Sequence, residues 1–211
     1  MRKRSSIIVI VVGLVAVTIA SVVSMYPSLS DARDTVEAEW STAEQALEAR
    51  YDALAELSRA VRAVQADLEL LDEVDDALGD WKAAASQRPT PDPDDEPPVA
   101  NRVEGAAARL ARTVTSRPSL RGNGDVVLAL LGYLGTDPTA ALQPYNDAVQ
   151  RFDRARNRFP GPFFAEILGF DALSTVEVPG ALAELDLPDP PTPEPPPTES
   201  DAEATTPTPA G

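Results

Sequence analysis

The densest group of side chains that could do chemistry is a set of acids in the first half of the chain. Five carboxylates fall close together: Glu69, Asp72, Glu73, Asp75 and Asp76. Two carboxylates can hydrolyse a glycosidic bond when burial or close apposition raises the pKa of one of them. Helical spacing places most of these acids on a face that should be wet. The sequence therefore favours a protein that is not an enzyme, with a carboxylate-based envelope hydrolase as the alternative.

Composition excludes most other chemistry. The chain has neither cysteine nor histidine, so zinc–thiolate sites, disulfides, Ser-His-Asp triads and Glu-x-x-His di-iron sites are excluded. The formal net charge of −16 argues against nucleic acid as a partner, because phosphate binding needs a basic surface. The acids of residues 86–98 lack the spacing of a calcium loop. No metal, cofactor or catalytic residue is expected.

The N-terminus predicts a membrane anchor. Arg2, Lys3 and Arg4 precede an uncharged apolar run at residues 7–23. About 20 apolar residues span a bilayer, so residues 7–26 are long enough to cross it once. Because basic flanks stay in the cytoplasm, residues 1–26 should form a cytoplasmic cap and anchor in the cell membrane, with the rest of the chain outside the cytoplasm. The alternative is a cleaved signal peptide, which would make the chain a secreted bundle protein.

One long helix is expected after a hinge at residues 27–34. Apolar residues then recur by threes and fours to about residue 86: Trp40, Ala43, Leu47, Leu54, Leu57, Val61, Val64, Leu68, Leu71 and Leu78. This seam of period 3.5 leaves polar gaps at Arg50 and Asp75 and is typical of a helix in a bundle. A coiled coil that forms a homo-oligomer is the alternative.

Two more helices should follow a loop at residues 86–98, whose prolines and aspartates predict solvated, irregular chain. The first covers about residues 99–116 and ends before Pro118. The next covers about residues 125–134, with Asp125 as its N-cap.

The last helix should start at Asp137, with Pro138 as its first helical residue, and run to Arg158. A bend at Pro144 is left open. Phe159 and Pro160 then stop it. Residues 162–170 should plug the end of the bundle, with contact to the membrane surface as the alternative.

These elements predict an all-α fold, in which a transmembrane helix precedes an elongated antiparallel bundle of about four helices over residues 27–171. An extended segment should cover residues 172–186. Residues 187–211 are rich in proline and acids, which predicts a disordered tail.

Three blocks of this sequence resemble the LemA family of bacterial helical proteins. Residues 40–57 carry the first, residues 118–136 the second and residues 145–170 the third, which is the most specific. The matching positions are Trp40, Arg50, Asp52, Leu54, Leu57, Asn123, Tyr145, Asn146, Val149, Phe152, Phe159, Pro160, Gly169 and Phe170.

The resemblance implies a membrane anchor followed by a bundle outside the cytoplasm. It implies no reaction, since the family has no generally established one, although some relatives help to organise bacterial membranes. We therefore expect a cell-envelope protein that mediates protein–protein or membrane-organising interactions. Its partners would be the lipid bilayer, through residues 7–26, and unidentified envelope proteins.

Overall fold

The computed structural model of the chain describes residues 2–65, 67–87, 89–158, 165 and 167–179. In the first helix, the side chains of residues 2–12, 14–19, 21–23 and 25 are outside this description. The regular elements of the described chain are all helices: α1 (Arg2–Val64), α2 (Glu69–Ser86), α3 (Glu96–Ser116), α4 (Pro118–Arg121), α5 (Gly124–Gly135) and α6 (Thr139–Arg158). The predicted all-α class is confirmed for these residues.

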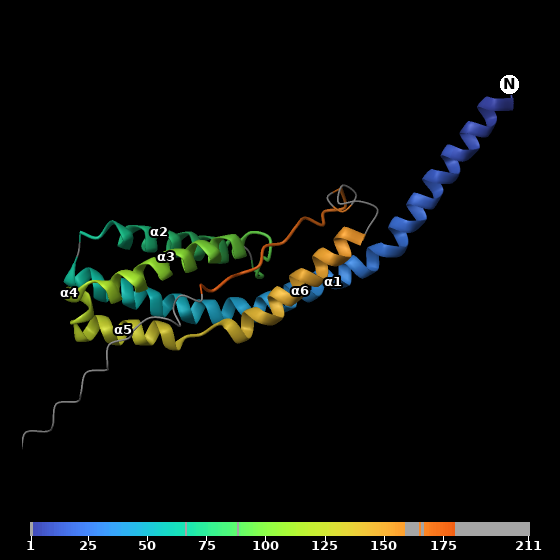
Figure 1. The fold of residues 1–211 in the computed structure, drawn as a ribbon. Coiled ribbons are helices and arrows are strands. Elements are labelled where there is room, and N and C mark those ends of the chain that lie inside the picture. The colour runs from blue at the N-terminus through green and yellow to red at the C-terminus, as the bar shows by residue number, and fades with distance from the viewer. Residues whose placement is uncertain (1, 66, 88, 159–164, 166, 180–211) are drawn as a thin grey trace, which may run out of the picture.

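The other long helices pack around α1. In Figure 1, α2 and α3 lie along one side of α1, while α5 and α6 follow one another along the other side. The N-terminal part of α1 projects alone beyond the bundle. Because α5 and α6 follow one another along the same side of α1, they take the place of one long helix. Together with α1, α2 and α3 they form the helical bundle that the sequence predicted (Figure 1).

Two rows of side chains on α1 face the other helices. Each row repeats every seven residues, which keeps its members on one face of a helix. The first row is Leu29, Val36, Ala43, Arg50 and Leu57, and the second is Trp40, Leu47, Leu54 and Val61; all are buried. The seam that the sequence predicted is therefore correct as far as Val61.

The expected hinge at residues 27–34 is wrong, because α1 continues through Pro27. A proline inside a helix removes one hydrogen bond and crowds the preceding turn, at a cost of about 3 kcal/mol. Leu29 and Val36 extend the first row directly after the proline and are both buried. Their packing stabilises the helix where the local sequence disfavours it.

The long helix expected up to residue 86 is interrupted, because α1 ends at Val64 and α2, which begins at Glu69, runs back along it (Figure 1). Val64 is exposed, so the rows of α1 end one turn before the helix does. Reversal lets α2 bury its own stripe against α1 and α3: Leu71, Val74, Ala77, Leu78 and Trp81. A straight helix would have left this stripe in water.

The loop at residues 86–98 is shorter and less solvated than expected. α3 begins at Glu96, with Pro97 and Pro98 in its first turn, where a missing N–H removes no helical hydrogen bond. Asp92 and Glu96 are buried rather than solvated. Asp94 lies at the surface and receives two hydrogen bonds from the guanidinium of Arg33 on α1.

The ends of the later helices differ from expectation by one or two residues. Asn123, not Asp125, caps α5, because its side-chain oxygen accepts the Val126 N–H at 3.1 Å. α6 begins at Thr139, whose N–H donates to the Asp137 carboxylate at 3.0 Å. α6 also continues through Pro144.

Within the described residues, no helix has the length and apolar character that a membrane crossing requires. Most side chains of the predicted anchor, residues 7–26, lie outside the description. So do Phe159, Pro160 and the predicted tail at residues 187–211.

Candidate functional site

A buried polar network lies where α1, α3 and α5 meet. Arg50 occupies a position in the first row of α1, so the fold carries its side chain into the core, where it is 2% exposed. Glu104 of α3 faces it and is 1% exposed. Burying a lone charge is costly, so each of these two groups needs the other.

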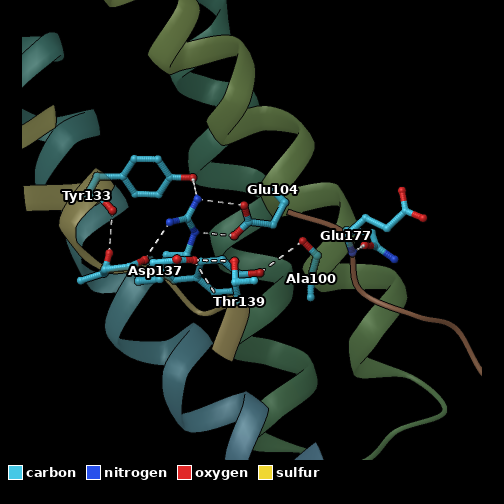
Figure 2. A network of polar contacts seen from close by, with 10 residues as sticks. Ala100, Glu104, Tyr133, Asp137, Thr139 and Glu177 are labelled. Carbon is cyan, nitrogen blue, oxygen red and sulfur yellow. Dashed lines mark hydrogen bonds and ion pairs between the residues drawn. The ribbon is translucent and has the colours of Figure 1, made fainter. Parts of the chain in front are cut away.

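The guanidinium of Arg50 is held by three partners, drawn in Figure 2. Its Nε and Nη2 donate to the two carboxylate oxygens of Glu104 at 2.8 and 3.2 Å. Its Nη2 also donates to the Tyr133 hydroxyl at 2.6 Å, and its Nη1 to the Thr136 carbonyl at 2.8 Å. The guanidinium carbon lies 4.2 Å from the centre of the Tyr133 ring.

The network holds the helices in register and offers no free chemical group. Burial raises the pKa of Glu104, while the bonds from Arg50 oppose that rise. Burial likewise raises the pKa of Tyr133, so the phenol stays protonated well above neutral pH. A two-pronged carboxylate–guanidinium pair of this kind fixes geometry as well as charge.

A cluster of aromatic rings fills the next layer of the core. The Trp40 ring lies 4.7 Å from that of Tyr145 and 6.5 Å from that of Trp81, which in turn lies 5.0 Å from Tyr51. The Trp40 indole N–H donates to the buried carboxylate of Glu96 at 2.5 Å. Glu96 also lies in the first turn of α3, where the helix dipole favours a negative charge.

An extended segment, residues 171–178, packs between α3 and α6; we call it the C-terminal strap. Leu173 and Val176 are buried in the core. In Figure 1 the strap runs back along the bundle from the end of α6. The sequence indicated its extended backbone but not its burial.

Side chains of both helices hydrogen bond to the backbone of the C-terminal strap. Asn146 on α6 pairs with Val176, donating to its carbonyl at 2.8 Å and accepting its N–H at 3.0 Å. On the other edge, Asn101 on α3 donates to the Thr175 carbonyl at 2.8 Å and accepts the Glu177 N–H at 3.0 Å.

The Tyr145 hydroxyl makes one further bond to the C-terminal strap, donating to the Ser174 carbonyl at 2.6 Å. Buried backbone groups need partners. Among the described residues no neighbouring strand provides these hydrogen-bond partners. The side chains of Asn101, Asn146 and Tyr145 provide them instead. The motif residues Tyr145 and Asn146 are therefore binders of extended backbone.

Ala165 and residues 167–170 form a turn that precedes the C-terminal strap; we call it the Gly169 turn. The Phe170 N–H donates to the Ala165 carbonyl at 2.9 Å, and Gly169 has φ of +80°, a region that favours glycine. The Phe170 ring packs 6.3 Å from that of Phe152 and 5.5 Å from that of Tyr26.

The other motif residues have simpler positions. Leu54 and Leu57 lie in the rows of α1, Val149 and Phe152 lie on the buried face of α6, and Asn123 caps α5. Asp52 is exposed. The motif residues that the structure describes therefore serve packing, capping, backbone binding or, at Arg50, a buried ion pair, with Asp52 as the exception.

The acid set that suggested a hydrolase lies at the surface. Glu69, Asp72, Glu73, Asp75 and Asp76 are all exposed. Arg62 bridges Asp72 at 3.2 Å and Asp75 at 2.7 Å, while Arg109 pairs with Glu73. Across the described residues, no three acids converge as metal ligands would.

Glu44 is the acid whose surroundings come closest to those of a catalytic carboxyl. Burial raises its pKa, and the charges of Glu96 and Glu48 raise it further. It lines a surface pocket with Glu48, Tyr51 and Lys82. Its neighbour Glu96 accepts the hydrogen bond of the Trp40 indole, which ties that carboxylate to the aromatic core.

Comparison with known proteins gives one positive result. The model of the LemA family matches residues 39–186. The match covers the rows of α1 from Trp40 onward, the Arg50 network and the C-terminal strap. A search among curated proteins finds no match.

Replacing Glu104 by alanine should destabilise the bundle by about 3–5 kcal/mol, because Arg50 would stay buried without a counter-charge. The double variant Arg50→Met/Glu104→Leu should lose less, since neither charge remains. Chemical denaturation followed by circular dichroism measures both. The matched control is Arg59→Ala, which breaks the exposed Arg59–Glu56 pair and should leave the midpoint unchanged. A Glu104→Ala variant as stable as the parent contradicts this account.

Asn146→Ala should loosen the C-terminal strap. It leaves the buried Val176 N–H without a partner, which costs ~1–3 kcal/mol and raises the open fraction on the order of tenfold. A Glu-specific protease should then cleave after Glu177 correspondingly faster, as followed by mass spectrometry. Asn157→Ala, an exposed position on the same helix, is the control. Equal cleavage rates for the two variants would show that Asn146 does not hold the segment.

Proposed function

We propose that the chain, which belongs to the LemA family, is a single-pass membrane protein of the cell envelope. Residues 7–26 anchor it, its N-terminus lies in the cytoplasm, and its bundle mediates protein–protein or membrane-organising interactions outside the cytoplasm. It acts as an interaction module and not as an enzyme.

The continuity of α1 is the observation that supports the anchored arrangement most. The helix runs from Arg2 to Val64 without a break, so the apolar run at residues 7–23 and the buried rows of the bundle belong to one helix. In such an arrangement the anchor and the bundle share one helix, with no loop between them. The basic cluster Arg2–Arg4 supports a cytoplasmic N-terminus.

The use of the polar residues supports a binding role. The buried charges of Arg50 and Glu104 form an ion pair with each other. The surface acids at residues 69–76 form ion pairs with arginines or face water. A catalytic pair would need a carboxyl held in a concave site with a raised pKa and a facing partner. Glu44 has a raised pKa and lines a pocket, but its neighbour Glu96 is bonded to the Trp40 indole. The exposed faces of the helices suit docking of other envelope components.

Cysteine labelling tests this topology directly, because the natural chain has no cysteine. Ser5→Cys should resist a membrane-impermeant maleimide in intact cells and react after permeabilisation. Ser28→Cys, an exposed position just after the predicted span, should react in intact cells. Both should stay with the membrane fraction.

Two results would contradict the proposal. Loss of the Ser5→Cys label from the mature chain would mean that the N-terminus is cleaved. Protection of Ser28→Cys in intact cells would place the bundle on the cytoplasmic side.

A further inference from the structure

Three large apolar side chains are exposed at one end of the bundle. Ile167 is 64% exposed, Tyr26 46% and Leu168 37%. Ile167 and Leu168 belong to the Gly169 turn, whose Phe170 ring contacts the ring of Tyr26 at 5.5 Å. We call these three residues the end patch.

The inner side of the same turn is buried. Ala165 is fully buried and Phe170 nearly so, and Arg156 Nε donates to the Phe170 carbonyl at 3.0 Å. The turn therefore closes the bundle with one side while Ile167 and Leu168 remain outside. Plugging alone does not account for these two side chains.

The end patch lies where α1 leaves the bundle. Figure 1 shows α1 projecting from the end of the bundle at which α6 terminates. Tyr26 is the last residue of the range proposed to span the membrane, and tyrosine favours the boundary between lipid and water. The contact with Phe170 thus places the Gly169 turn at the level of that boundary.

The end of α6 adds positive charge beside the end patch. Residues 151–158 carry four arginines and one aspartate, in a chain whose net charge is −16. Arg151, Arg154 and Arg158 are exposed. Arginines next to exposed apolar side chains are typical of surfaces that rest on anionic lipid.

We infer that the end patch and the arginines at the end of α6 form a second contact with the bilayer, made with anionic lipid headgroups at the outer surface of the membrane. Ile167 and Leu168 enter the boundary between headgroups and acyl chains, and the exposed Arg151, Arg154 and Arg158 bind lipid phosphates. This contact rests on the anchoring proposed above. It would hold the bundle against the membrane at two points, α1 and the Gly169 turn.

A lipid surface fits better than a second copy of the chain or another protein. The end patch is small, it adjoins the proposed span, and its neighbouring charge is opposite to that of the rest of the molecule.

The test uses the full chain in vesicles of phosphatidylcholine with phosphatidylglycerol. Ile167→Cys carries an environment-sensitive fluorophore, and brominated acyl chains serve as the quencher. The matched control is Leu128→Cys, because Leu128 is 56% exposed on α5, at the other end of the bundle. Thermal melting checks that both labelled variants stay folded.

The label at position 167 should lose roughly half its fluorescence or more, since an interfacial side chain reaches the acyl boundary. The label at position 128 should be unchanged. Arg154→Glu/Arg158→Glu should weaken quenching at position 167, and so should vesicles without phosphatidylglycerol.

Flotation of the vesicles separates this inference from the anchoring itself. If the chain floats but position 167 is not quenched, or is quenched no more than position 128, the second contact is absent and the anchor stands. Chemical cross-links between chains at position 167, without quenching, would assign the end patch to a second copy. If the chain does not float, both proposals fail.

Discussion

Packing of the whole bundle depends on the two seven-residue rows of α1. α2, α5 and α6 all contact this helix, and the C-terminal strap fills the space beside it. A seven-residue repeat keeps its members on one face only while the helix is continuous. That requirement explains why α1 passes through Pro27: Leu29 and Val36 belong to the same row as Ala43 and Leu57.

One member of the first row is charged, and its partners order the helices around it. Apolar contacts tolerate small shifts of one helix along another. The hydrogen bonds that the Arg50 guanidinium donates do not, because Glu104, Tyr133 and the Thr136 carbonyl must each lie in the direction of an N–H group. The network therefore fixes the register of α3 and α5 against α1. The C-terminal strap then bridges α3 and α6, using Asn101 on one edge and Asn146 on the other.

The sequence predicted the features that repeat. The spacing of apolar residues predicted the rows of α1 and the all-helical class. The family resemblance singled out Tyr145 and Phe152, which are both buried in the core. The gap at Arg50 was visible, and a charge in an apolar row signals a buried pair. Its partner could not be named, because Glu104 lies on another helix amid other acids of the chain.

The features that escaped prediction depend on distant contacts. Residues 65–68 contain neither glycine nor proline, so nothing local marks the reversal that lets α2 pack against α3. Asn101 and Asn146 look like ordinary surface amides until the C-terminal strap lies between them. The burial of Asp92 and Glu96 likewise depends on tertiary packing, which overrode the solvated loop that their sequence suggests.

Native-state hydrogen exchange, resolved along the chain by mass spectrometry, tests most directly whether α1 is the element on which the others depend. Amides of residues 36–61 should exchange only through global unfolding, with the same denaturant dependence as the whole bundle. Amides of α2 should open in smaller, separate events. If residues 36–61 exchange through local opening while α2 and α3 stay protected, the central role assigned to α1 is wrong.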